Sequence, residues 1–243
     1  MWLNAEQLSD RAISCFQKTL QSSHPRYVII DNLFNEVKLD EVHCALQQPY
    51  CWQTQRHTYS ALYVDQNEWQ STSDDNRFVK RDVWTKENNS RDKKVNQSNA
   101  KQVIQARENE AQEFLKFLRC EEFMLQLSRI FNVVITDKNV TDPTINTNYF
   151  RMSATDFVEQ HADDSPGREI CMLLYLNKDW NHNSGGELTF MGKNNNPISI
   201  APLYNRCVLF DPSSEGSEHW VKKLNGEHTD QYRYNVTSWY WSE

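Results

Sequence analysis

The stretch of sequence that decides the fold lies between residues 171 and 210 and reads CMLLYLNKDW NHNSGGELTF MGKNNNPISI APLYNRCVLF. It contains four short runs rich in aliphatic and aromatic residues, at 171–176, 187–190, 198–200 and 206–210. The turn residues Gly185, Gly186 and Pro197 separate these runs, and Asp211-Pro212 follows the last one. Apolar runs with turn residues between them are typical of β-strands. Their number and spacing predict a β-sandwich or jelly roll.

The rest of the chain divides into a helical half and a continuation of the strands. Further strands are expected on the C-terminal side at 133–135, 146–152 and 234–241, and on the N-terminal side at 27–30 and 52–64. Apolar residues at helical spacing predict helices over about 8–20, 36–47 and 103–131, with a break near Arg119-Cys120. No Pro- or Gly-rich linker separates the halves. We therefore expect a single α+β domain over 1–243, in which residues 1–132 support a jelly-roll core at 133–243.

Composition excludes several classes of protein. The chain has 243 residues and a formal net charge of −7, which disfavours nucleic acid as the main ligand. Aromatic residues make up 12%, more than a disordered chain carries. No apolar run approaches the roughly 18 residues that span a bilayer, and the N-terminus lacks the basic and apolar regions of a signal peptide. We expect a cytoplasmic protein that binds neither nucleic acid nor a membrane, with its six cysteines reduced.

Residues 66–102 differ from the rest of the chain, because they are rich in Asn, Ser, Asp and Lys and poor in aliphatic residues. They contain one apolar cluster, formed by Phe78, Val79, Val83 and Trp84. A loop of this length in a compact domain is usually functional or mobile. We predict a lid that closes over the functional site and excludes water. The alternative is a surface insertion whose apolar cluster packs on the barrel as an edge strand.

The segment that carries chemistry is Gln160-His161-Ala162-Asp163-Asp164. Side chains two residues apart on an extended strand point to the same side, so His161 and Asp163 can face one ion. A second histidine, His219, follows the strand at 206–210. Two histidines and one carboxylate on one face of a metal leave the opposite positions open, which is typical of the non-haem Fe(II) oxygenases. His161, Asp163 and His219 are therefore the candidate metal ligands.

Two more residues can converge on the same place. Arg233 lies 14 residues after His219, at the start of the last expected strand. A guanidinium there can bind a carboxylate through two hydrogen bonds. Tyr175, on the strand that follows the His-x-Asp segment, can direct its phenol toward the same point. These residues predict a site for an anion beside the metal.

The order and spacing of these motifs resemble those of a known family of enzymes. The matching strings are His161-Ala162-Asp163-Asp164, Cys171 to Trp180, Ser184 to Leu188, Asn205 to Phe210, Glu218 to Val221 and Arg233 to Tyr240. The sequence resembles the 2-oxoglutarate- and Fe(II)-dependent dioxygenase superfamily, within it the prolyl-hydroxylase-like branch. The resemblance covers about residues 146–241, and residues 1–145 match only loosely. It implies a double-stranded β-helix, or jelly roll, with flanking N-terminal helices.

The resemblance also implies the cofactors and their residues. Fe(II) would bind His161, Asp163 and His219, and the cosubstrate 2-oxoglutarate would pair its 5-carboxylate with Arg233 and accept a hydrogen bond from Tyr175. Further expected roles are contact with the cosubstrate for Asn235 and Tyr149, and contact with the substrate for Trp239 and Arg168. Asn235 stands where the family often has Ser, in an Arg-x-Ser pattern. Tyr149 and Trp239 also fit ordinary core positions, and Arg168 a solvated turn.

The implied reaction is hydroxylation of an unactivated C–H bond by O2, with decarboxylation of 2-oxoglutarate to succinate and CO2 and with ascorbate as a reductant. The expected substrate is a prolyl or other amino-acid unit, presented as an amino acid, a peptide or a small molecule. The sequence stops soon after its last expected strand, whereas oxygen-sensing prolyl hydroxylases carry a further segment, which weakens the inference to a protein-bound proline. The alternatives are an oxygenase that tailors a natural product and a non-catalytic jelly-roll binding protein.

Overall fold

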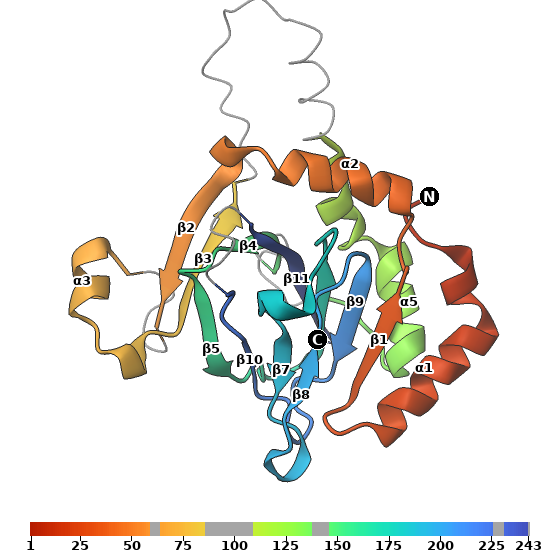
Figure 1. The fold of residues 1–243 in the computed structure, drawn as a ribbon. Helices are drawn as coiled ribbons and strands as arrows, with labels where there is room; N and C mark the ends of the chain where they lie inside the picture. The colour runs from red at the N-terminus through yellow and green to blue at the C-terminus, as the bar shows by residue number, and fades with distance from the viewer. Residues whose placement is uncertain (59–63, 86–108, 138–145, 226–230, 243) are drawn as a thin grey trace, which may run out of the picture.

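A curled antiparallel β-sheet forms the centre of the molecule (Figure 1). The computed structural model describes residues 1–58, 64–85, 109–137, 146–225 and 231–242. The strands within these ranges are β1 (Tyr27–Asp31), β2 (Trp52–His57), β3 (Val79–Trp84), β4 (Thr147–Met152), β5 (Phe157–His161), β6 (Arg168–Tyr175), β7 (Leu188–Phe190), β8 (Ile198–Ile200), β9 (Arg206–Phe210), β10 (His219–Val221) and β11 (Arg233–Trp241). Their order in the sheet is β1-β9-β6-β11-β4-β3-β5-β10-β7-β8, and β2 pairs with β3. The predicted jelly-roll core with flanking helices is confirmed.

Three helices lie along one side of the sheet: α1 (Asp10–Ser22), α2 (Glu36–Leu46) and α5 (Glu121–Phe131) (Figure 1). Capping side chains fix the starts of α1 and α2, because the Ser9 hydroxyl accepts from the amide of Ala12 and the Asn35 side chain accepts from that of Lys38. Residues 109–117 are also helical, whereas the short α3 (Gln66–Ser71) lies apart from the other helices. None of the helices described is both long and apolar enough to cross a membrane.

Alternation along β6 places its side chains in two of the three hydrophobic clusters found among the described residues. On β6, the even-numbered Ile170, Met172 and Leu174 pack in the core that includes the helices, whereas Cys171, Leu173 and Tyr175 face the opposite way. This second core is completed by side chains of β7, β8 and β9. Because successive side chains of a strand point to opposite faces, one strand serves both cores. The odd-numbered face of β6 is the one that borders the functional site.

Most expected elements are present, but the strand predicted at 133–135 is not. Helix α5 ends at Asn132, which adopts a left-handed conformation with φ of 54°. Residues 133–135 pair with no strand in the described part of the chain, and Val134 is 71% exposed. The amide of Ile135 is instead bonded to the side chain of Ser128. The prediction of a strand at 133–135 is therefore wrong. A short apolar run that follows the C-terminus of a helix has the same local sequence pattern as a short strand.

Part of the predicted lid is a strand of the sheet. Residues 79–84 form β3, which pairs with β2 through six residue pairs and also with β4 and β5. Val79 and Trp84, from the apolar cluster, are buried. The polar residues between them find partners in neighbouring strands, since Lys80 pairs with Asp156 and Asp82 with Arg151. The cluster thus packs on the barrel as a strand, as the alternative had it, but β3 is paired on both sides and is not an edge strand. Residues 86–102 of the segment lie outside the described residues.

Candidate metal centre and its pocket

The two histidines face each other across a pair of antiparallel strands. His161 is the last residue of β5 and His219 the first of β10, and the two are direct partners in the register. Opposite residues in a sheet have their Cβ atoms about 4.5–5.5 Å apart, so the side chains on one face meet. The centroids of the two imidazole rings are 4.2 Å apart. Strand pairing alone therefore brings both rings to one point.

Hydrogen bonds orient both rings. Nδ1 of His161 lies 2.8 Å from the carbonyl oxygen of Glu159, and Nδ1 of His219 lies 2.9 Å from that of Ser217. Because a carbonyl oxygen only accepts, each Nδ1 carries a hydrogen and donates it, which leaves Nε2 as the nitrogen that can face a metal ion. Burial, with the neighbouring His219, holds the pKa of His161 well below its usual value. Neutral imidazoles bonded in this way to carbonyl groups are the form that binds metal ions.

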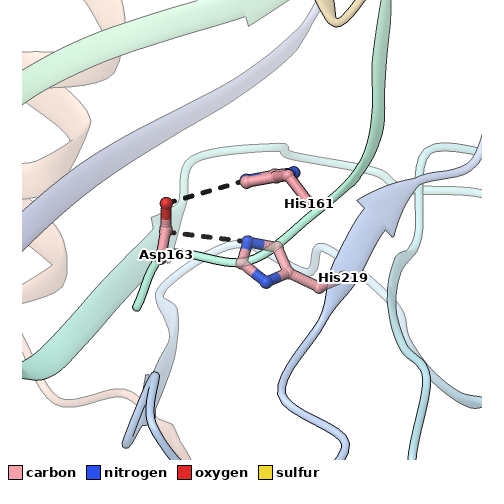
Figure 2. Close-up of side chains that lie close together, drawn as sticks. All are labelled: His161, Asp163 and His219. Carbon is pink, nitrogen blue, oxygen red and sulfur yellow. Dashed lines mark ion pairs between the residues drawn. The ribbon is translucent and has the colours of Figure 1, made fainter. Parts of the chain in front are cut away.

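Asp163 completes a cluster of three ligating groups (Figure 2). Its Oδ1 lies 3.8 Å from Nε2 of His161, and its Oδ2 lies 3.7 Å from Nε2 of His219. These distances are too long for hydrogen bonds, yet the ligand atoms of all three residues lie within 4.8 Å of one another. Burial tends to raise the pKa of Asp163, but the surrounding groups outweigh burial and lower it, so the carboxylate is ionised. Two imidazoles and one carboxylate are a donor set that suits Fe(II).

A cavity of about 660 Å³ adjoins the three side chains. Its walls come from alternate residues of β2, β3, β4 and β11. The wall residues include Gln53, Gln55, His57, Arg81, Asn148, Phe150, Arg233, Thr237 and Trp239. The cavity thus connects the His-Asp-His cluster with Arg233, which sequence analysis assigned to the same site.

Arg233 is a cation held deep in the wall of this cavity, with 1% of its surface exposed. Its Nε donates to the carbonyl oxygen of Gly186 at 2.7 Å, and its Nη1 donates to the side-chain oxygen of Asn235 at 2.7 Å. Within the described residues, its Nη2 and the hydroxyl of Tyr175 are buried without a hydrogen-bond partner. The guanidinium carbon lies 4.9 Å from the centre of the Tyr175 ring. Two unused donors at one point fit the carboxylate of a bound anion.

The protonation of Tyr175 suits this role. Burial raises the pKa of its hydroxyl to about 12, although the positive charge of Arg233 works in the other direction. The phenol is therefore protonated at neutral pH, and it can donate a hydrogen bond to an acceptor that enters the cavity. A buried hydroxyl or guanidinium with no partner costs free energy until a ligand satisfies it. Arg233 and Tyr175 thus fit the 5-carboxylate of 2-oxoglutarate.

Gly186 lets the chain approach the arginine closely. It adopts a φ of +77°, and a Cβ atom at this position would lie 3.1 Å from Cδ of Arg233 and 2.9 Å from the ring of Trp180. The carbonyl oxygen of the same residue accepts from Arg233. The glycine pair noted in the sequence as a tight turn therefore also forms part of the cradle around the guanidinium.

Of the two further residues expected beside the cosubstrate, Asn235 lines the cavity next to Arg233. The side-chain oxygen of Asn235 accepts from Arg233, and its Nδ2 donates to the hydroxyl of Thr237 at 2.9 Å, so Asn235 holds the arginine. Tyr149 does not line the cavity. It lies in the helix-side core and donates to the carbonyl oxygen of Ala111 at 2.8 Å. Its neighbours Asn148 and Phe150 face the cavity, so strand alternation turns Tyr149 away and its predicted contact is corrected to a core position.

Trp239 and Arg168, the two predicted substrate contacts, both line the cavity and both contact Asp163. The indole nitrogen of Trp239 donates to Oδ2 of Asp163 at 2.9 Å. Nη1 of Arg168 donates to the backbone carbonyl oxygen of Asp163. Cavity residues of β2 and β3, such as His57 and Arg81, were missed because their segments were read as a weak strand and a loop. The signal was present, since Gln53, Gln55 and His57 alternate along the sequence.

Comparisons with known proteins agree with this geometry. Residues 147–241 match the sequence model of the 2OG-Fe(II) oxygenase superfamily. The chain is also similar to prolyl 3-hydroxylase OGFOD1 of Mus musculus, with 27% identity over 133 residues. That alignment covers 52% of this chain and 23% of the mouse protein, so the chain spans about a quarter of the length of this relative.

Solved structures share the fold. One is a prolyl hydroxylase of Trichoplax adhaerens in complex with a hypoxia inducible factor peptide fragment, with a TM-score of 0.66, 19% identity, and coverage of 98% of this chain and 92% of that one. Another is a prolyl-4-hydroxylase of Pseudomonas putida, with a TM-score of 0.58, 13% identity, and coverage of 94% and 98%. At these identities the likeness establishes a common double-stranded β-helix.

Proposed function

We propose that the protein, whose residues 147–241 match the sequence model of the 2OG-Fe(II) oxygenase superfamily, is an Fe(II)- and 2-oxoglutarate-dependent dioxygenase that hydroxylates a prolyl or other amino-acid unit. One observation carries the proposal. A cluster of two histidines and one carboxylate shares a cavity with a buried arginine and a buried phenol that have unused donors among the described residues. Binding of 2-oxoglutarate needs this combination, because one end of the anion binds a metal ion and the other end binds a cationic side chain.

His161, Asp163 and His219 are the residues that would hold Fe(II), His161 and His219 through Nε2 because each Nδ1 is engaged by a carbonyl group. Three protein ligands leave positions free for the cosubstrate and O2. When bound, Fe(II), 2-oxoglutarate and O2 supply an oxidation in which the substrate gains one oxygen atom while 2-oxoglutarate loses CO2 and becomes succinate. The protein's part is to orient these groups and to exclude water.

Arg233 and Tyr175 would orient the cosubstrate. The guanidinium is fixed by Gly186 and Asn235, so it does not have to be ordered when the anion binds. Nη2 and the Tyr175 hydroxyl can then each donate to one carboxylate. Burial strengthens these hydrogen bonds, since the site has a lower dielectric constant than water.

The choice of an amino-acid unit as substrate rests on the relatives. The mouse relative is a prolyl 3-hydroxylase, and the Trichoplax enzyme was solved with a peptide fragment. The cavity of about 660 Å³ is of the size that takes a small-molecule ligand or the side chain of a peptide. A prolyl residue in a peptide is therefore the first substrate to test.

The activity can be tested in two steps. Anaerobic titration with Fe(II) and then 2-oxoglutarate should produce the weak visible metal-to-ligand charge-transfer band of a chelated cosubstrate, and His219→Ala should abolish it. Without this band in the wild-type protein, the proposal is wrong. Prolyl peptides and free amino acids are then incubated with O2, and mass spectrometry measures the gain of one oxygen together with succinate. Oxygen gain only on non-amino-acid compounds would instead support a natural-product oxygenase.

A further inference from the structure

Asp163 differs from the two histidines in how it is held. His161 and His219 end and begin paired strands, and each ring is bonded to a backbone carbonyl group. Asp163 lies two residues beyond the end of β5, in a segment that has no strand pairing before β6 begins at Arg168. Its position cannot come from the sheet register, so other contacts must provide it.

Trp239 contacts the carboxylate directly. Its indole Nε1 donates to Oδ2 of Asp163 at 2.9 Å. Trp239 belongs to β11, which is paired on both sides, with β4 and β6. In the register with β6 it stands opposite Cys171, a fully buried residue. The indole N–H therefore belongs to a strand that is held by hydrogen bonds to a neighbouring strand on each side.

Arg168 holds the backbone of the same residue. Its Nη1 donates to the carbonyl oxygen of Asp163 and lies 3.9 Å from Oδ1. Its guanidinium also stacks on two indoles, with the central carbon 5.5 Å from the ring centre of Trp239 and 4.9 Å from that of Trp241. The tryptophan and the arginine thus support each other and together fix both the main chain and the side chain of Asp163.

We propose that Trp239 and Arg168 form a clamp that positions Asp163 for metal binding, with Trp239 holding one carboxylate oxygen and leaving the other for the ion. This inference rests on the proposed function of the metal centre. A carboxylate has two oxygens that can both bind one metal ion. An indole N–H on Oδ2 favours binding through a single oxygen, which keeps the remaining positions of the metal open for cosubstrate and O2. Trp239 and Arg168 are positioning residues in this scheme.

Two variants separate positioning from simple packing. Trp239→Phe removes the N–H but keeps an aromatic ring against Arg168. Trp241→Phe is the matched control, because Trp241 stacks on the same guanidinium but does not contact the carboxylate of Asp163. The probe is Co(II) alone, without cosubstrate, and the readouts are its dissociation constant and its visible absorption spectrum, which depends on coordination number.

Trp239→Phe is expected to weaken Co(II) binding by about 10-fold or more and to change the spectrum, because loss of a hydrogen-bond partner of a ligand costs about 10–100-fold in metal affinity. Trp241→Phe is expected to keep the wild-type constant and spectrum. Wild-type values for Trp239→Phe would overturn the clamp. A wild-type protein that does not bind Co(II) would instead overturn the metal centre itself, and the clamp with it.

A second variant keeps the inference testable if Trp239→Phe does not fold. Arg168→Met retains a long side chain between the two indoles and removes the donor to the carbonyl oxygen of Asp163. It is expected to weaken Co(II) binding several-fold, with the Tm of the metal-free protein changing no more than in Trp241→Phe. Unchanged Co(II) binding in Arg168→Met would show that the arginine does not position Asp163. The proposed clamp would then be wrong.

Discussion

A buried cation without an ion-pair partner costs free energy, and Arg233 is such a cation within the described part of the chain. Gly186 and Asn235 hold it without neutralising it, because a backbone carbonyl group and a side-chain amide carry no charge. An anion that enters the cavity would supply the missing negative charge. The same logic applies to Tyr175, whose phenol is protonated and has no acceptor among these residues.

Each of His161→Ala, Asp163→Ala and His219→Ala is expected to abolish turnover and weaken Fe(II) binding by more than about 10-fold, since removal of even a hydrogen-bond partner of a ligand has that effect. Equilibrium dialysis under anaerobic conditions measures the binding. His57→Ala is the control, because His57 lines the same cavity outside the cluster and should retain Fe(II). If any two of the three variants bind Fe(II) normally, the ligands have been misassigned.

Arg233→Ala is expected to raise the KM for 2-oxoglutarate strongly and leave metal binding nearly intact. Removal of one partner of a buried charge pair costs on the order of 2–5 kcal/mol. Tyr175→Phe should have a smaller effect, about 1.5–3 kcal/mol, since it removes one hydrogen bond to a charged group. The control is Arg129→Ala, because Arg129 of α5 pairs with Asp10 and does not line the cavity. A normal KM in Arg233→Ala would show that another residue holds the cosubstrate.

At the scale of elements, strand register decides which residues reach the site. The sequence motif was enough to name His161, Asp163 and His219, and the structure brings them together because β5 and β10 pair at the two histidines. Tyr149 could not be assigned from sequence, since its face depends on the pairing of β4 with β11. Sequence alone predicts a loop at β3 because three charged residues, Lys80, Arg81 and Asp82, separate its apolar positions, and their partners lie far away in sequence.

The turn before β7 offers a test of this element-scale packing. Gly186→Ala is expected to raise the KM for 2-oxoglutarate and lower stability by about 1–3 kcal/mol, because the new Cβ is placed at positive φ and against Arg233. Gly192→Ala serves as the control. Its φ is also positive and its Cβ would meet the backbone of Asn196, away from the arginine. Gly192→Ala should lower Tm and keep the KM. Equal changes in KM for both variants would contradict a specific cradle around Arg233.

At the scale of the whole molecule, the N-terminal half is part of the sheet rather than only a support. β1 pairs with β9 through five residue pairs, and β3 connects β4 to β5. The helices cover the core on the even-numbered face of β6. Sequence periodicity predicted these helices, but could not show that strands from the first half complete the barrel, because long-range pairing leaves no local signal.

A fragment of residues 133–243 is therefore expected not to fold. It would lack β1, β2 and β3 and would expose the apolar side chains of β6 and β11 that the helices cover. Circular dichroism and proton NMR should show a loss of fixed tertiary structure compared with the full chain. If the fragment is folded and binds Co(II), residues 1–132 are a separable support, contrary to the single domain expected from the sequence.

Ligand binding and global stability are coupled, and this coupling tests the whole site at once. A ligand that binds only the native state, present at 100 times its dissociation constant, stabilises that state by about 2.7 kcal/mol, which for a protein of this size raises Tm by roughly 5–10 °C.

Co(II) alone should raise the Tm of the wild-type protein, and 2-oxoglutarate should add a second increase in the presence of Co(II). Arg233→Ala should keep the first increase and lose the second, because the metal ligands are intact. His219→Ala should lose both, because the cosubstrate is bound through the metal as well as through the arginine. Differential scanning fluorimetry measures all of these shifts. A full cosubstrate increase in Arg233→Ala would place the anion elsewhere, and a full metal increase in His219→Ala would show that Co(II) stabilises the protein from another site.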